Sequence, residues 1–270
     1  MKRLGLLFIC SLCLVLCHAT TRSTTHATLF GFGHVSQLDT YLSPLNYSGP
    51  QFHLMQESLR MTHLADSAIS FQTIWQGNLS YTKNASGKAR HIGGNCRFDA
   101  TWHYHLQAGP VRLLLGPQIG SDIGFLYNTR NGNNPAQAQL SAHLGASAAA
   151  IYPFRLWRQP LTVRYQLDLP LLGLMFSPNY GQSYYEIFSL GNTDHNVCLT
   201  HPFNAFSSRH LLTVDIPLRG VTLRTGYLCD IRQSHVNDLK FHSYTHAFML
   251  GIVRYFNILH PRTTPKGFIL

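Results

Sequence analysis

ISFQTIWQGNLSY, residues Ile69 to Tyr81, alternates between mostly apolar and mostly polar side chains. Successive side chains of a β-strand point to opposite faces, so this spacing predicts a strand with one apolar and one polar face. The apolar face carries Ile69, Phe71, Thr73, Trp75, Leu79 and Tyr81. The polar face carries Ser70, Gln72, Gln76, Asn78 and Ser80.

The same period of two runs outward from this stretch through the rest of the chain. It predicts ten strands, at about 25–37, 51–64, 69–83, 91–106, 111–128, 137–154, 161–176, 208–217, 220–233 and 240–258. Several of these are much longer than the five or six residues usual in soluble sheets. A tilted strand needs about 9–11 residues to cross a bilayer, so the lengths indicate membrane strands.

The composition tells which face of the strands meets water. The chain is 45% hydrophobic, which excludes a disordered protein, but only 12% of its residues are charged. A soluble sheet would carry many Lys and Glu on its polar face, whereas here that face is mostly Gln, Ser, Thr and Gly. We therefore predict an all-β fold, a transmembrane up-and-down antiparallel β-barrel whose apolar face meets lipid and whose polar face lines the lumen.

The connections between the predicted strands alternate in length. Longer ones are expected at 38–50, 84–90, 129–136, 177–207 and 234–239, and short turns between the other strand ends. Short turns at one rim and long loops at the other are typical of outer-membrane barrels. An even number of strands places both termini on the periplasmic side. Twelve strands are the alternative if the 177–207 loop contains a hairpin near 184–190 and 195–200.

The N-terminus has the layout of a secretory signal peptide. Lys2 and Arg3 precede an uncharged stretch from Leu4 to Leu16, and Ala19 is a suitable cleavage site. The predicted domains are a signal peptide at 1–19, the barrel at 20–258 and a C-terminal tail at 259–270. Three cysteines follow the signal peptide, and whether Cys96 and Cys198 pair is left open.

The charge balance bears on partners. The net charge is +10, and removing Lys2 and Arg3 lowers it by two to +8. No Lys/Arg cluster or nucleic-acid-binding motif accompanies this excess, so no nucleic-acid partner is expected. The expected partners are outer-membrane lipid and lipopolysaccharide, with a glycan or protein at the long loops.

Three segments carry a family resemblance: YLSPLNYSGP (41–50), NTRNGNNPAQ (128–137) and FSPNYGQSYYEIF (176–188). With the signal peptide and the strand pattern, they resemble a domain-of-unknown-function family of Bacteroidota outer-membrane β-barrel proteins. The resemblance implies a barrel fold in the cell outer membrane. It implies no activity and no catalytic residues.

Charged residues fall on the polar face and are expected to pair inside the lumen, because buried charges need partners. The predicted lumen network is Arg112, Asp122, Arg164, Asp168, Asp215, Arg224, Asp230 and Arg232. Such a network would fill the lumen, whereas the alternative is a narrow polar pore.

The long loop predicts a contact surface. Tyr180, Tyr184, Tyr185 and Phe188 lie in it, and Tyr-rich loops bind partners at low entropic cost. The same loop could instead fold inward as a plug.

No catalytic, cofactor or metal site is predicted. His103 and His105 share a strand face but lack a third ligand, so lumen histidines are the expected reading. A rim hydrolase is the second alternative function. Its candidate groups are Asp122, Asp194, His195, Asp230 and His235. No serine stands in a nucleophile elbow, so the expected role is structural or binding rather than enzymatic.

Overall fold

Ten long strands form a closed antiparallel barrel. The computed structural model describes residues 23–257. The barrel strands are β1 (Ser23–Asp39), β2 (Ser43–Met61), β3 (Ile69–Asn84), β4 (Arg90–Ala108), β5 (Val111–Asn128), β6 (Ala136–Leu156), β7 (Gln159–Phe176), β9 (Ser207–Leu218), β10 (Val221–Val236) and β11 (Leu239–Asn257). These bounds confirm all ten predicted strands to within a few residues, except that β2 begins earlier. The signal peptide and the 259–270 tail lie outside the described residues.

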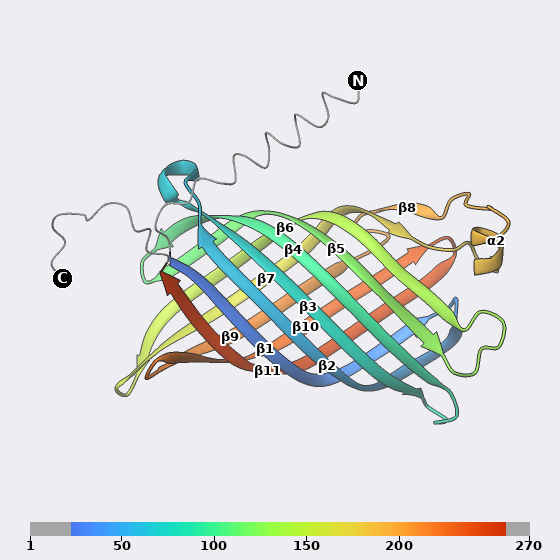
Figure 1. Cartoon of the computed structure of the whole chain (residues 1–270), viewed down its shortest axis with the longest axis horizontal. Helices are drawn as coiled ribbons and strands as arrows, with labels where there is room; N and C mark the ends of the chain where they lie inside the picture. The colour runs from blue at the N-terminus through green and yellow to red at the C-terminus, as the bar shows by residue number, and fades with distance from the viewer. Residues whose placement is uncertain (1–22, 258–270) are drawn as a thin grey trace, which may run out of the picture.

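Each barrel strand pairs with the next barrel strand along the chain, and the last, β11, pairs with the first, β1. The hydrogen-bonded order is β6-β5-β4-β3-β2-β1-β11-β10-β9-β7, and β6 pairs with β7 to complete the ring. Ser23 of β1 lies opposite Asn257 of β11, so the first strand begins and the last strand ends at the same rim (Figure 1). We call this the terminal rim and the opposite one the loop rim.

The faces of the strands follow the predicted alternation. On β3, Gln72 and Gln76 are each 1% exposed, whereas Leu79 is 64% exposed. The polar side chains therefore lie inside and the apolar side chains outside, which is the reverse of a soluble sandwich. This confirms the transmembrane type of barrel. No helix within residues 23–257 is long and apolar enough to span a membrane.

An apolar cluster also lies inside the barrel, which the alternation did not predict. Its members are Leu29, Met55, Ile74, Leu211, Leu228, Ala247 and Met249. These side chains are fully or almost fully buried, so they exclude water from part of the lumen. The interior is a packed core with polar clusters, and it is not uniformly polar.

Two of the expected long loops are tight turns. β1 ends at Asp39 and β2 begins at Ser43, so the expectation of a loop over 38–50 is wrong. Asn237 and Asp238 both have positive φ in the two-residue turn between β10 and β11. Such turns match the twist of antiparallel strands, which lets β10 and β11 continue to the turn.

The 177–206 segment contains no extra barrel hairpin, so the alternative of twelve strands is wrong. Tyr184–Phe188 forms the short helix α2, and Val197–Thr200 forms β8, which pairs only with the end of β7. β7 pairs with β9 as far as Asp168 and with β8 from Gly173 onward. Pro170 lies between these two pairings, and on the other edge of β7 it stands opposite Gly145 of β6, next to a register shift.

Candidate functional site

A first cluster of ion pairs lies in the half of the lumen nearer the terminal rim. Arg164 of β7 pairs with Glu57 of β2. Arg224 of β10 also contacts Glu57, with Nη1 2.7 Å from Oε2. Arg224 binds Asp215 through two hydrogen bonds, from Nε at 2.6 Å and from Nη2 at 2.8 Å. Gln72 Nε2 donates to Glu57 Oε1 at 2.7 Å, so the carboxylate of Glu57 is fully engaged.

A second cluster lies farther toward the loop rim. The guanidinium of Arg209 is completely buried. Its Nη1 lies 2.7 Å from Asp99 Oδ2, and its Nη2 lies 2.6 Å from Asp168 Oδ2. Arg97 Nε contacts Asp99 Oδ2 at 2.9 Å. Gln166 joins the two clusters, because it accepts a hydrogen bond from Arg164 and donates one to Asp168.

These ion pairs cross the lumen. In the ring of strands, β2 and β7 are separated by four strands in either direction, so Arg164 and Glu57 come from opposite walls. Arg209 on β9 and Asp99 on β4 likewise come from walls that are not adjacent. Side chains that meet from opposite walls obstruct the path along the axis.

The structure brings together four of the eight residues predicted for the lumen network: Arg164, Asp168, Asp215 and Arg224. Asp122 and Arg232 form a separate pair at 3.9 Å. Asp230 is buried, and its Oδ1 has no hydrogen-bond partner. Arg112 is exposed near the terminal rim and belongs to neither cluster, so its place in the predicted network is wrong.

The predicted network omits four charged members of the clusters: Glu57, Arg97, Asp99 and Arg209. Each stands at an inward position of its strand, and this parity was a usable signal. Arg97, for example, is two residues before Asp99, which the alternation does place inside. The inward position of a residue on its strand does not identify its partner across the lumen.

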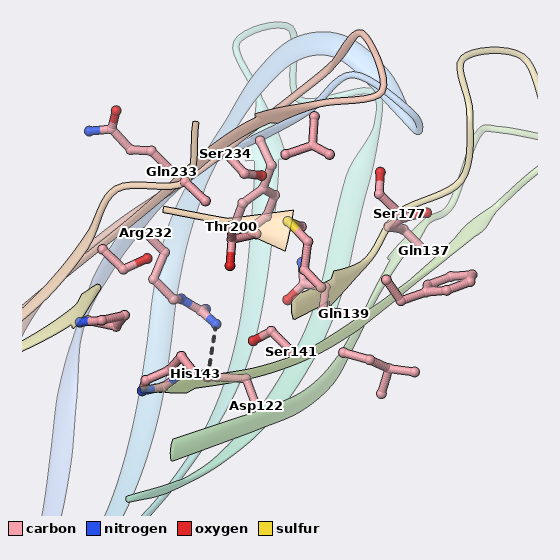
Figure 2. A pocket seen from close by; sticks show the side chains of 18 of the residues that line it. Asp122, Gln137, Gln139, Ser141, His143, Ser177, Thr200, Arg232, Gln233 and Ser234 are labelled. Atoms are coloured by element: carbon pink, nitrogen blue, oxygen red, sulfur yellow. Dashed lines mark ion pairs between the residues drawn. The ribbon is translucent and has the colours of Figure 1, made fainter. Parts of the chain in front are cut away.

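A cavity of about 130 Å³, which we call the vestibule, lies between the second cluster and the loop rim. Its lining extends from the strand ends at Asp39 and Ser177 down to Arg97 and His143. Figure 2 shows Gln139, Ser141 and His143 of β6 on one side and Arg232 with Thr200 on the other. The dashed line joins Arg232 to Asp122. Most of the labelled side chains are uncharged amides and hydroxyls.

Glycines shape the β5 wall beneath the vestibule. A Cβ atom at Gly120 would lie 2.4 Å from both Asp99 Oδ1 and His143 Nε2. A Cβ atom at Gly124 would lie 2.9 Å from Asn95 Nδ2. The two glycines therefore let polar side chains of β4 and β6 fold over β5 on either side of Asp122.

Several buried polar atoms that line the vestibule have no hydrogen-bond partner in the described chain. They are Asn95 Nδ2, Arg97 Nη2 and Asp122 Oδ1, whereas His143 Nε2 lies 3.5 Å from Asp99 Oδ1. An unsatisfied buried donor or acceptor costs about 1–3 kcal/mol. A polar ligand or bound water in the cavity would satisfy these three atoms.

The long loop presents aromatic side chains beside the vestibule. Tyr180, Tyr185 and Phe188 are exposed, whereas Tyr184 is half-buried and anchors the loop. The Tyr184 hydroxyl donates to Gln137 Oε1 at 3.0 Å and accepts the Ala138 N–H at 2.6 Å. Burial raises the pKa of Tyr184 to about 12, so its hydroxyl stays protonated at neutral pH. Three of the four predicted contact residues are thus free to touch a partner.

A capping box and an aromatic contact fix the loop. Ser183 Oγ accepts the Glu186 N–H, and the Glu186 carboxylate accepts the Ser183 N–H at 2.6 Å. Those hydrogen bonds hold the pKa of Glu186 below its usual value. Tyr41, in the β1–β2 turn, packs edge-on against Tyr184 with ring centroids 5.8 Å apart. The loop therefore lies against the rim.

The other residues considered for catalysis or metal binding do not form a shared site. Asp194 and His195 form an ion pair at 3.0 Å, but both side chains are about four-fifths exposed. His103 bonds to Ser147, and His105 bonds to Ser70. Within residues 23–257, no group of three or more His, Cys, Asp or Glu side chains is arranged to hold a metal ion. Cys96, Cys198 and Cys229 are free thiols, so Cys96 and Cys198 do not pair.

Comparisons with known proteins find a matching family and several similar solved structures. A family model described as a protein of unknown function (DUF3316) matches residues 7–263, while no curated protein matches the sequence. Similar solved structures include the outer-membrane protease OmpT of Escherichia coli, at 8% identity and a TM-score of 0.43, covering 88% of this chain and 98% of that one.

Two Neisserial barrels are also similar. The translocator domain of the autotransporter NalP from Neisseria meningitidis is 11% identical with a TM-score of 0.40, covering 94% of this chain and 96% of that one. Neisserial surface protein A is 10% identical with a TM-score of 0.34, covering 84% of this chain and 96% of that one. At such identities the likeness concerns the fold alone.

Proposed function

The chain belongs to the family described as protein of unknown function (DUF3316), and for this member we propose the role of a closed, non-enzymatic binding barrel in the cell outer membrane. In this proposal the signal peptide is removed after export, and both termini lie in the periplasm. The loop rim then faces the cell exterior. The barrel holds a rigid binding surface there and conducts no steady flow of ions.

The observation that carries the proposal is the pair of cross-lumen contacts, Arg164 with Glu57 and Arg209 with Asp99. A pore needs a continuous polar path, whereas these side chains meet in mid-lumen and the apolar cluster around Met55 excludes water nearby. Opening the path would separate buried opposite charges. Breaking a buried pair costs about 3–5 kcal/mol, so a closed lumen is the favoured state.

The exposed aromatic side chains of the loop support the binding part of the proposal. Tyr180, Tyr185 and Phe188 present large rigid surfaces that lose little conformational entropy on contact. The partner we propose is a glycan, lipopolysaccharide or protein at the cell surface, with outer-membrane lipid around the barrel. The binding role includes no catalytic step and no nucleic acid.

Single-channel recording in planar bilayers tests the closed lumen. The unmodified protein should insert without steady conductance, and Arg209→Ala should produce a leak because it removes a guanidinium from the constriction. Arg158→Ala, at an exposed position in the β6–β7 turn, is the matched control and should stay silent. A large, steady conductance of the unmodified protein would instead support a narrow pore.

Binding at the loop has its own test. The triple variant Tyr180→Ser, Tyr185→Ser and Phe188→Ser should lose retention of purified lipopolysaccharide or surface glycan, while the barrel still folds. Equal retention by the variant and the unmodified protein would show that the aromatic side chains of the loop do not bind these ligands.

A further inference from the structure

The vestibule has the chemistry of a ligand site rather than of a passage. Its floor is closed by the second ion-pair cluster, and its rim lies beside the anchored loop. We propose that the vestibule binds one ring of a neutral sugar. This inference rests on the proposed function, because it assumes a closed barrel with its loop rim outside the cell.

The unsatisfied atoms specify both hydrogen-bond donors and acceptors. Asn95 Nδ2 and Arg97 Nη2 can only donate, and Asp122 Oδ1 can only accept when ionised. His143 Nε2 lies 3.5 Å from Asp99 Oδ1, so its partner is a carboxylate of the second cluster. A hydroxyl group both donates and accepts, so a polyhydroxylated ring can satisfy the other three atoms at once.

The lining groups favour a neutral ligand over a simple ion. They include two carboxylates, Asp39 and Asp122, and three basic groups, Arg97, Arg232 and the exposed Lys240. Arg97 is already engaged by Asp99. An anion would lie against Asp122 and leave its oxygen unsatisfied. An amine would leave the donors of Asn95 and Arg97 unsatisfied.

The gap between Asp122 and Arg232 is wide enough for both side chains to bind a ligand hydroxyl. Their nearest charged atoms are 3.9 Å apart, which is too long for a direct hydrogen bond. A hydroxyl between them would accept from Arg232 and donate to Asp122.

The size limits the ligand to a single ring. A cavity of about 130 Å³ has no room for a second ring. Its wall adds uncharged polar groups at Gln139, Ser141 and Ser234. The exposed aromatic residues of the loop provide apolar faces for further rings of a chain, since the Tyr184 anchor contacts Gln137 of the vestibule wall.

Isothermal titration calorimetry on the full-length mature protein in detergent tests this site. The probes are the methyl glycosides of glucose, galactose and mannose, with glucuronate and glucosamine as charged arms. At least one neutral glycoside should bind, and the charged arms should bind at least tenfold more weakly. A disaccharide with the same terminal ring distinguishes two kinds of natural ligand. It should bind if the vestibule takes the end of a glycan chain, and it should not bind if the vestibule takes only a free monosaccharide.

Two substitutions on the same strand, β6, separate the site from general effects. Ser141→Leu places a bulky side chain inside the vestibule and should weaken binding at least tenfold. Ala146→Leu places the same side chain on the exposed outer face, away from the vestibule lining, and should leave binding unchanged. Asp122→Asn keeps the shape, removes the anionic acceptor and should weaken binding.

Either of two results would overturn the sugar site: no neutral glycoside binds the folded protein, or binding is the same in Ser141→Leu and Ala146→Leu. Neither result depends on conductance. A steady current in bilayers would contradict the closed barrel even if a sugar binds, so the two failures are distinguishable.

Discussion

Arg209 on β9 and Asp99 on β4 meet inside the barrel at 2.7 Å, although 110 residues separate them in the chain. Their strands are not neighbours in the ring, so the pair spans the lumen. Both side chains are almost completely buried. A buried pair of this kind is costly to break, which makes the lumen charges the first target for tests.

Replacing Arg164 with Ala should lower stability. The change leaves Glu57 with only Arg224 as a charged partner, and the expected loss is about 3–5 kcal/mol for an unbalanced buried pair. Urea titration of the protein refolded into lipid vesicles measures it. Arg112→Ala, which removes an exposed charge, is the control and should change stability by less than about 1 kcal/mol. Equal losses in both variants would contradict the network.

Replacing Leu115 with Arg should impair membrane insertion. Leu115 is exposed on the outer face of β5, where a charge costs roughly 2–4 kcal/mol near the bilayer midplane. Gln118→Arg places the same group in the polar lumen on the same strand and should be tolerated better. Refolding yield in lipid vesicles compares them. Similar yields would contradict the assignment of the two faces.

Epitope tags should reveal the orientation of the barrel. A tag inserted in the loop, between Leu190 and Thr193, should be reached by antibody on whole cells. A tag in the β6–β7 turn at Trp157 should be reached only after the outer membrane is permeabilised. The opposite labelling pattern would reverse the predicted orientation.

Replacing Tyr184 with Phe should loosen the loop. The change deprives Gln137 Oε1 and the Ala138 N–H of their hydroxyl partner, at a cost of about 1–3 kcal/mol. Limited proteolysis within 177–206 should accelerate. Tyr185→Phe removes an exposed hydroxyl and should leave the cleavage rate unchanged. Equal rates in the two variants would show that Tyr184 is no anchor.

Acid should weaken the cap of α2. The pKa of Glu186 is lowered by its hydrogen bonds to Ser183, so its stabilising contribution is present above the unfolded-state pKa. It is lost as pH falls through the lower, folded-state value. Proteolysis of the loop by pepsin should therefore increase as the pH falls below about 4. In Glu186→Gln this pH dependence should disappear, because the amide does not titrate.

The sequence by itself determined the strands and their faces. Alternation with a period of two is a local property, and each strand of a barrel must keep its apolar side toward lipid. The stretch from Ile69 to Tyr81 therefore predicts its own inside and outside without knowledge of its neighbours. Its length also distinguishes it from a strand of a soluble sheet. The inward direction of Arg164 and Asp168 followed from the same pattern.

Only the tertiary structure decided which inward charges meet. The contacts of Arg209 with Asp99 and of Arg164 with Glu57 depend on ring closure and on the register of every intervening strand. The 177–206 segment also needed tertiary context, because β8 exists only through its pairing with β7. The vestibule depends on both of these tertiary features, because its floor is a contact across the lumen and its wall includes β8. Alternation places a side chain inside the barrel. Its partner there depends on distances between strands that are far apart in the chain, and no local stretch of sequence determines these.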